Sequence, residues 1–385
     1  MKRLIEILDR TLDWRWLPTV SQAVIRHAVA IQQIPAPTFS ESRRAAYVAE
    51  QLKALNLATV ETDDLHNVYG LWAGKDQQAP ALMLSAHTDT VFPEETVLTT
   101  RTEGQHIYGP GLGDNSLGVG ALIGIAHALR AGHILPEGNI WLVATVGEEG
   151  LGDLRGMKAA FTRLRPHVKS FINIEGLAFE HIYHGGIAVR RLHITAHAEG
   201  GHSWLNFGRP SAVHGVLQLG ARITMLQPPA APRTTFNIGI IEGGQSINTI
   251  ASQAGLWLDL RSEDQASLAE LERQVRLEVE ALATTELKFS VVVVGDRPAG
   301  RIPAEHPLVQ GALAALAQVG INGTLETGST DANIPLAAGC PAVTIGLTRG
   351  GNAHRLDEYI DTEPLISGLR QLFLLTLAAT SRENL

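Results

Sequence analysis

The sequence predicts an α/β fold, in which a mostly parallel sheet is covered by helices and is interrupted by a smaller α+β domain of the ferredoxin-like type. Strand-like and helical segments alternate from about residue 17 to residue 180, as they do in chains that build parallel sheets. From residue 187 to residue 298 the order becomes β-α-β-β-α-β, the split pattern of ferredoxin-like domains. After Gly300 the α/β alternation resumes. We therefore expect one domain built from residues 1–186 and 299–385, with residues 187–298 inserted into it.

Hydrophobic periodicity assigns the elements of the larger domain. Residues 1–17 mix apolar positions with acids and arginines, which indicates an amphipathic helix and not the uninterrupted apolar run of a signal peptide. Helical spacing is also found in residues 45–55, 118–131, 154–164, 306–319 and 363–380. Runs typical of strands are residues 58–62, 68–73, 81–86, 140–146, 171–174 and 341–347.

The inserted domain opens on an alternating strand. Residues 189–198 place polar and apolar side chains on opposite faces, as a strand with one solvated face does. The other expected strands are residues 234–241, 256–261 and 287–294, and the expected helices are residues 211–226 and 268–284.

Composition excludes several classes of protein. The net charge of −8 and the lack of any run of Lys or Arg disfavour a nucleic-acid partner. The single cysteine, Cys340, excludes an intramolecular disulfide, and its apolar neighbours favour a small buried thiol over a nucleophile. No stretch approaches the length of a membrane span. We expect a cytoplasmic protein that does not bind membranes.

Acidic residues and histidines follow the strand-like runs at five places. They are His87 with Asp89, Asp114 in a glycine-rich loop, Glu148 with Glu149, Glu175, and His354. In open α/β sheets the ligand site lies at the carboxyl ends of the strands. Carboxylates and imidazoles are the groups that bind Zn²⁺, Mn²⁺ or Co²⁺. The pattern therefore predicts metal binding at one edge of the sheet, as a two-metal hydrolase requires.

Local geometry suggests a division of roles within these motifs. His87 and Asp89 leave their strand on the same side, so one can bind metal while the other orients it. Glu148 and Glu149 cannot both face one metal from a regular strand, so we expect one to bind metal and the other to transfer a proton. The glycines around Asp114 do not form a dinucleotide-binding loop, because the third glycine of the GxGxxG pattern is replaced by Ser116.

Taken together, the motifs resemble those of the M20 family of metallopeptidases and deacylases, over nearly the whole chain. The resemblance implies that Asp114 bridges two divalent metal ions, most often Zn²⁺, with Co²⁺ or Mn²⁺ as alternatives. It also implies the other roles: His87 and Glu175 at one metal, Glu149 and His354 at the other, Glu148 as general base, and Asp89 orienting His87. The family usually has a second Asp after the bridging one, often joined by a cis peptide; this chain has Asn115 there.

Segments in and after the inserted domain extend the resemblance. His202, in Gly200–Ser203, is implied to reach the active site of a partner subunit and to stabilise the oxyanion. Asn248, after Gly243 and Gly244, and Arg261 are implied to bind substrate, Arg261 through a carboxylate. Gly328 belongs to a loop, residues 327–331, that resembles one lining the family's pocket. A homodimer formed through the inserted domain, acting as a lid, is also implied.

The resemblance implies a two-metal amidohydrolase that cleaves an amide bond in a small N-acyl amino acid or a short peptide. A metal-bridging hydroxide would attack the carbonyl carbon, and Glu148 would pass the proton to the leaving amine. Glu175 favours a deacylase or desuccinylase, whereas residues 327–333 also resemble peptidases, so this choice stays open. Two alternatives are a non-catalytic homologue that binds a peptide in the same cleft and a hydrolase with a single strong metal site.

Overall fold

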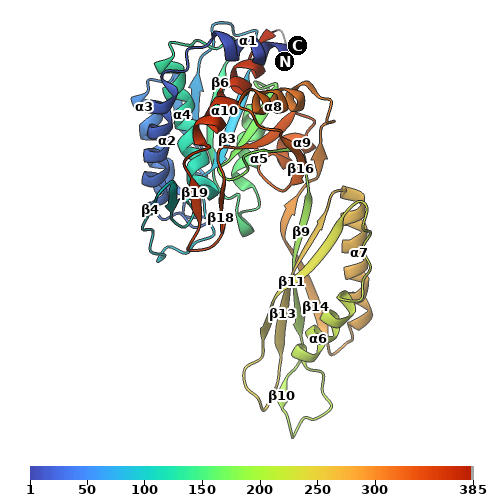
Figure 1. Cartoon of the computed structure of the whole chain (residues 1–385). Coiled ribbons are helices and arrows are strands. Elements are labelled where there is room, and N and C mark those ends of the chain that lie inside the picture. The colour runs from blue at the N-terminus through green and yellow to red at the C-terminus, as the bar shows by residue number, and fades with distance from the viewer. Residues whose placement is uncertain (383–385) are drawn as a thin grey trace. The chain divides into compact units, whose positions relative to one another are not determined.

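The computed structural model, which describes residues 1–382, divides into two compact units (Figure 1). The larger unit comprises residues 1–186 and the chain from Gly300 onward, and the smaller is Ile187–Ala299. Each unit has its own hydrophobic core. Gly186 and Gly300 pair with each other in adjacent antiparallel strands, so the inserted segment leaves and re-enters the larger unit at neighbouring positions.

The larger unit is built on a nine-stranded sheet with the order β1-β2-β6-β3-β7-β17-β8-β15, in which β16 also pairs with β8. The four central strands, β6, β3, β7 and β17, are parallel to one another. Antiparallel pairs lie on both sides of them, because β2 pairs antiparallel with β6 and β8 with β17. The sheet is therefore parallel at its centre and mixed at its margins. Its strands are β1 (Thr59–Thr62), β2 (Val68–Trp72), β3 (Leu82–His87), β6 (Ile140–Thr145), β7 (Ser170–Glu175), β8 (His181–Gly186), β15 (Gly300–Arg301), β16 (Thr324–Gly328) and β17 (Ala342–Gly346).

Helix α4 packs directly on the parallel centre of the sheet, and α2 packs on α4. The glycines of α4 permit this close approach, since a Cβ added to Gly120 would lie 2.9 Å from the Val24 carbonyl oxygen of α2. Figure 1 shows α2, α3 and α4 together on one side of the sheet. No helix within residues 1–382 is long and apolar enough to cross a membrane. The helices of this unit are α1 (Lys2–Thr11), α2 (Leu17–Gln32), α3 (Ser42–Ala54), α4 (Leu117–Ala131), α5 (Arg155–Leu164), α8 (Pro307–Gln318), α9 (Asn333–Ala337) and α10 (Leu365–Ala379).

A second, small antiparallel sheet in the larger unit has no counterpart in the sequence-based expectations. Its order is β18-β19-β5-β4. The loop between β18 and β19 carries His354, and its last residue, Glu358, accepts a backbone hydrogen bond from Gly109 at 2.8 Å. The small sheet thereby brings the late histidine beside the glycine-rich loop of Asp114. Its strands are β4 (Arg101–Glu103), β5 (His106–Tyr108), β18 (Gly350–Gly351) and β19 (Tyr359–Asp361).

The smaller unit is a four-stranded antiparallel sheet with the order β11-β13-β9-β14, packed against two helices. In chain order its elements run β-α-β-β-α-β: β9 (Ala188–His197), α6 (Ala212–Ile223), β11 (Thr234–Gly243), β13 (Gln253–Ser262), α7 (Gln265–Leu282) and β14 (Lys288–Arg297). Helix α7 begins where Asp264 accepts a hydrogen bond from the Ser267 N–H at 2.8 Å, a standard N-cap. A short pair, β10 (Gly201–His202) and β12 (Thr249–Ile250), adds a small ribbon.

Candidate metal centre

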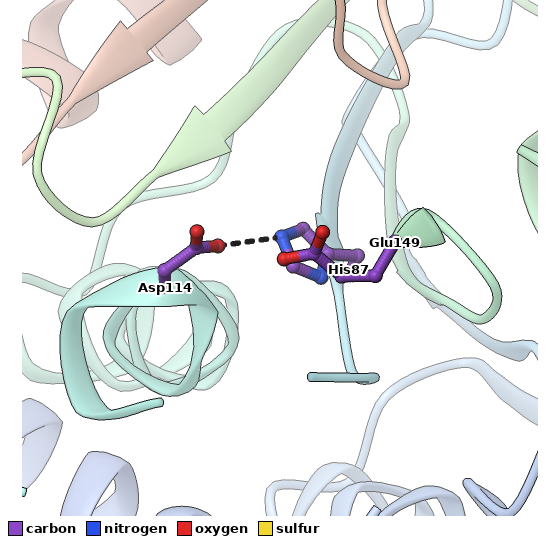
Figure 2. A group of neighbouring side chains, drawn as sticks. All are labelled: His87, Asp114 and Glu149. Carbon is purple, nitrogen blue, oxygen red and sulfur yellow. Dashed lines mark hydrogen bonds and ion pairs between the residues drawn. The ribbon is translucent and has the colours of Figure 1, made fainter. Parts of the chain in front are cut away.

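The parallel strands of the larger unit end at one edge of the sheet, and histidines and carboxylates follow them there. His87 is the last residue of β3, Glu175 is the last residue of β7, and Glu149 follows β6. Asp114 lies in the tight turn that leads into α4, and His354 lies in the loop between β18 and β19. Figure 2 shows His87, Asp114 and Glu149 pointing toward one another from three different elements.

The two carboxylate oxygens of Asp114 face two different histidines. Asp114 Oδ1 lies 3.1 Å from His87 Nε2, and Asp114 Oδ2 lies 3.1 Å from His354 Nε2. Each histidine also faces a second carboxylate: Glu175 Oε2 lies 3.7 Å from His87 Nε2, and Glu149 Oε1 lies 3.2 Å from His354 Nε2. Ligands about 2.0–2.1 Å from one tetrahedral cation are separated by about 3.3 Å. The structure thus contains two His–carboxylate groups that share Asp114.

The hydrogen bonds of His87 show that its Nε2 atom suits a cation. His87 Nδ1 lies 3.1 Å from the backbone carbonyl oxygen of Asp89, which can only accept, so Nδ1 carries a proton. In the neutral ring the lone pair is then on Nε2, and it points at carboxylate oxygens of Asp114 and Glu175. Two sets of lone pairs repel each other unless a positive centre lies between them. The donor set therefore fits a divalent metal ion.

The pKa shifts of the cluster arise from the attraction between its histidines and its carboxylates. Burial opposes charge on His87, but hydrogen bonds to Asp114, Asp89 and Glu175 raise its pKa well above the ordinary value. Hydrogen bonds to Asp114 and Glu149 raise the pKa of His354 to about 10. Burial works against ionisation of Asp114, yet its bonds to the two histidines lower its pKa. The carboxylates thus create a strongly negative pocket that favours positive charge.

Asp89 is completely buried and forms hydrogen bonds that hold the backbone around the candidate centre. Its side chain lies 3.5 Å from His87 Nδ1, farther than its own backbone carbonyl oxygen. The two carboxylate oxygens instead accept the backbone N–H groups of Glu148 at 2.9 Å and Glu149 at 3.0 Å. Thr38 donates a further hydrogen bond at 2.8 Å. Asp89 therefore holds the glutamate loop as well as the histidine.

Glu358 is a supporting residue that the sequence did not single out. It is fully buried, and its carboxylate accepts backbone hydrogen bonds from Gly113 at 2.7 Å, Asp114 at 2.9 Å and Gly111 at 3.2 Å. Burial raises its pKa to about 7, although the N–H donors work in the opposite direction. In the sequence it sits within a charged run, Arg355–Glu358, that looks like an exposed turn. No local signal distinguishes it.

The turn that Glu358 holds has an irregular backbone. The Asp114–Asn115 peptide bond is cis. The Asn115 side chain donates to the Ile174 carbonyl oxygen at 2.8 Å and accepts from the Gly176 N–H at 3.1 Å. Asn115 thereby ties the Asp114 turn to the end of β7, where Glu175 is located.

A pocket of about 370 Å³ opens beside the centre within the larger unit. Asp114 and Glu175 line one part of it, and Tyr183 and Gly328 line another. Tyr183 packs closely against Gly328, because a Cβ on that glycine would lie 2.8 Å from the Tyr183 ring. Gly328, which was expected to bind substrate, lines this pocket.

The other three residues expected at the site belong to the smaller unit. His202 is exposed in β10, where its Nδ1 accepts the N–H of Trp204 at 3.2 Å. Asn248 is exposed in the turn before β12. Arg261, near the end of β13, donates to its neighbour Asp259 at 2.6 Å. The structure brings the predicted metal ligands together within the larger unit, whereas these three lie in a separate unit.

Comparisons with known proteins find matches in both sequence and structure. The model of peptidase family M20/M25/M40 matches residues 83–378. The chain is 31% identical over 257 residues to a probable carboxypeptidase of Aspergillus clavatus, a match that covers 60% of this chain and 55% of that protein. It is 23% identical over 372 residues to a succinyl-diaminopimelate desuccinylase of Methylorubrum extorquens, covering 86% of this chain and 92% of that one. The chain spans little more than half the length of the first Aspergillus relatives.

Solved structures share the fold along nearly the whole chain. A tripeptidase from Staphylococcus aureus has a TM-score of 0.78 at 22% identity and covers 94% of this chain and 98% of its own. An aminopeptidase from Bacillus cereus has a TM-score of 0.76 at 19% identity, with coverage of 94% and 99%. At these identities the likeness concerns the fold, a mixed α/β architecture with a parallel sheet centre.

Proposed function

This chain belongs to peptidase family M20/M25/M40, and from that membership we propose that it is a metal-dependent hydrolase that cleaves amide bonds. The substrate we propose is a small N-acyl amino acid or a short peptide. One observation carries the proposal: the Asp114 carboxylate is shared between His87 and His354, each of which also faces a glutamate. The proposal of a non-catalytic homologue gains no support, because all five expected ligands converge.

We propose that the centre holds two divalent cations, with Zn²⁺ as the first candidate and Co²⁺ or Mn²⁺ as alternatives. His87 and Glu175 would hold one, Glu149 and His354 the other, and Asp114 would bind both through its separate oxygens. When bound, such ions polarise an amide carbonyl and lower the pKa of water. A single strong site is the simpler alternative, and counting metal ions per chain distinguishes the two.

Glu148 is the proposed general base. It is buried and directly precedes the ligand Glu149, and its backbone N–H is held by Asp89 Oδ1 at 2.9 Å. In this role the Glu148 carboxylate accepts a proton from the attacking water and donates it to the leaving amine nitrogen. A positioned acid–base group of this kind contributes roughly 10²–10⁴-fold to the rate.

The pocket beside the centre suggests where one part of the substrate binds. Its lining residues include His181 and Tyr183 but no Lys or Arg. As further substrate-binding residues we propose Arg261, through a substrate carboxylate, and Asn248.

We also propose that the smaller unit serves as a lid and forms a homodimer. Four large apolar side chains near the β10–β12 ribbon are strongly exposed: Trp204 at 83%, Leu205 at 77%, Phe207 at 92% and Ile247 at 104%. Exposed apolar groups that gather in this way are typical of interaction surfaces. In the dimer, His202 would reach the active site of the partner subunit and stabilise the oxyanion.

Matched glutamine variants test the proposal. The wild-type protein should bind about two metal ions per chain and hydrolyse N-acetyl or N-succinyl amino acids, or di- and tripeptides, in a metal-dependent way. Glu148→Gln should keep its metal and lose turnover, whereas Glu149→Gln should lose metal. Equal loss of metal in both variants would reverse the two roles. A wild-type protein without bound metal and without metal-dependent hydrolysis would refute the proposed function.

The trans role of His202 has its own test. Glu148→Gln and His202→Ala proteins are each expected to be inactive alone. After the two are mixed under conditions that exchange subunits, activity should return, because one site of the mixed dimer has both groups intact. An active monomer by light scattering, or no recovery in mixtures shown to contain mixed dimers, would refute the role.

A further inference from the structure

Asp331 is a buried acid that the proposed mechanism does not use. It lies between β16 and α9, is completely inaccessible to solvent, and reaches the end of β6 through its side chain. Asp331 Oδ2 lies 2.6 Å from Thr145 Oγ1. Asp331 Oδ1 is also buried and has no hydrogen-bond partner within residues 1–382. An isolated buried carboxylate is costly, so this geometry needs an explanation.

Thr145 connects Asp331 to the backbone on both sides of the ligand His87. The Thr145 hydroxyl lies 3.2 Å from the Ala86 carbonyl oxygen, which belongs to the peptide bond preceding His87. The Thr145 carbonyl oxygen accepts the N–H of Thr88 at 2.8 Å, and the Thr88 hydroxyl also donates to it at 2.8 Å. Thr145 thus holds the chain immediately before and immediately after the histidine.

Counting protons decides which group donates. The Thr145 hydroxyl has one proton and two neighbouring oxygens, Asp331 Oδ2 and the Ala86 carbonyl oxygen. The carbonyl oxygen can only accept. If Asp331 were ionised, Thr145 could satisfy only one of the two, and a charged oxygen, Oδ1, would remain buried without a partner. If Asp331 is a neutral acid, its own proton goes to Thr145 and the Thr145 proton goes to Ala86, so both contacts are hydrogen bonds.

We infer that Asp331 is a positioning residue that carries a proton at neutral pH, donates it in a hydrogen bond to Thr145 Oγ1, and thereby directs the Thr145 hydroxyl to the carbonyl group preceding His87. A neutral Asp331 helps to orient β3, the strand that ends at His87, without adding a further negative charge near the carboxylates of the centre. Burial raises the pKa of Asp331 to about 7; the Thr145 contact and the charge of His87 oppose this rise, and the charges of Glu175 and Asp89 add to it.

The test compares variants that keep or remove each donor. Asp331→Asn keeps an N–H donor without charge, and Asp331→Leu has none; Thr145→Ser keeps the hydroxyl, and Thr145→Val lacks it. Zn²⁺ affinity is measured by competition with a chromophoric chelator, which requires no activity. Asn and Ser variants should bind Zn²⁺ like the wild type, and their pH profiles of kcat/KM should not shift. Leu and Val variants should each lose on the order of tenfold in affinity, as changes behind a metal ligand do.

Infrared spectroscopy reports the proton directly. The wild type at pH 7 should show a carboxylic-acid C=O band that is lost in Asp331→Asn, while Thr145→Val should shift it. The double variant Asp331→Leu/Thr145→Val should lose less affinity than the sum of the single losses, because both break one chain of hydrogen bonds. Absence of the band, or an Asp331→Asn variant as impaired as Asp331→Leu, would overturn the inference.

The activity measurement rests on the proposed function, whereas the infrared and Zn²⁺ measurements do not. A wild-type protein that binds Zn²⁺ but cleaves no amide would refute the proposed function alone. The infrared band and the four Zn²⁺ affinities would still decide the role of Asp331. If Asp331→Leu fails to fold, the Thr145→Ser and Thr145→Val pair carries the same comparison, and equal affinities in that pair would overturn the inference.

Discussion

Replacing Glu358 with glutamine should weaken metal binding even though Glu358 is not a ligand. The carboxylate holds the turn that presents Asp114 by accepting three backbone N–H groups, at 2.7, 2.9 and 3.2 Å. Glutamine retains one oxygen, which can keep the two shorter bonds to Gly113 and Asp114. Its amide nitrogen would then face the N–H of Gly111, so that two donors meet where a donor and an acceptor met before.

The size of the effect follows from those contacts. One lost charge-assisted hydrogen bond with an unsatisfied buried donor should cost about 1.5–3 kcal/mol of folding free energy in Glu358→Gln. Glu358→Ala removes all three bonds and should cost about 3–5 kcal/mol, since such losses are not fully additive. Metal affinity should fall roughly 10–100-fold, as it does when groups that orient metal ligands are removed.

Two assays separate folding from metal binding. Urea denaturation of the metal-free protein measures the loss of stability, and chelator competition measures the loss of affinity for Zn²⁺. Glu363→Gln is the control, because it removes the same charge from an exposed position five residues away. If Glu358→Gln matched that control in both assays, the three backbone contacts would contribute nothing. If stability fell but Zn²⁺ affinity did not, the hydrogen bonds of Glu358 would not be needed to position Asp114 for metal binding.

Three further predictions concern metal, pH and packing. Removal of metal by a chelator should lower the unfolding midpoint, and Zn²⁺ at a hundredfold excess over its Kd should restore about 2.7 kcal/mol; an unchanged midpoint would contradict a metal site. Burial, together with the neighbouring His127, lowers the pKa of His27 to about 4 from 6.5. The unfolded chain therefore binds more protons between these values, and stability should fall as the pH decreases from about 6.5 toward 4. Allowing for partial exposure, the loss is about 1–2 kcal/mol, and His27→Gln should remove it in urea titrations at several pH values. Gly368→Ala in α10 should cost roughly 3 kcal/mol, because its Cβ would lie 1.8 Å from the Leu347 carbonyl oxygen; Ser367→Ala is the matched control in the same denaturation assay.

Local sequence patterns predicted the central elements of the fold well. The strands that end at His87 and Glu175 were expected within a residue or two of their observed limits, because buried parallel strands appear as short apolar runs. The helix α4 and the order of elements in the inserted unit were expected for the same kind of reason. The margin formed by β8, β15 and β16 was not expected, because these strands lie in short, glycine-containing segments whose pairing is set by distant strands.

The small sheet β18-β19-β5-β4 was missed for a related reason. Its strands have two or three residues each, too few for any periodicity to appear. Helix α2 was also not assigned, although the alternating region was expected to begin near residue 17. The apolar residues of α2 pack mainly on the helix α4. The spacing of its apolar residues therefore reflects packing against another helix and not against the sheet.

For this protein the sequence by itself determined that His87, Glu149 and Glu175 gather at the sheet edge, since residues that follow parallel strands emerge on one side. Only the tertiary structure decided how those ligands are held. Glu358 binds a turn 244 to 247 residues earlier in the chain, and Asp331 binds Thr145 across 186 residues. In the sequence, a buried carboxylate cannot be distinguished from one that is exposed at the surface. Its partners, and therefore its protonation and its role, exist only once distant segments meet in a place that excludes water.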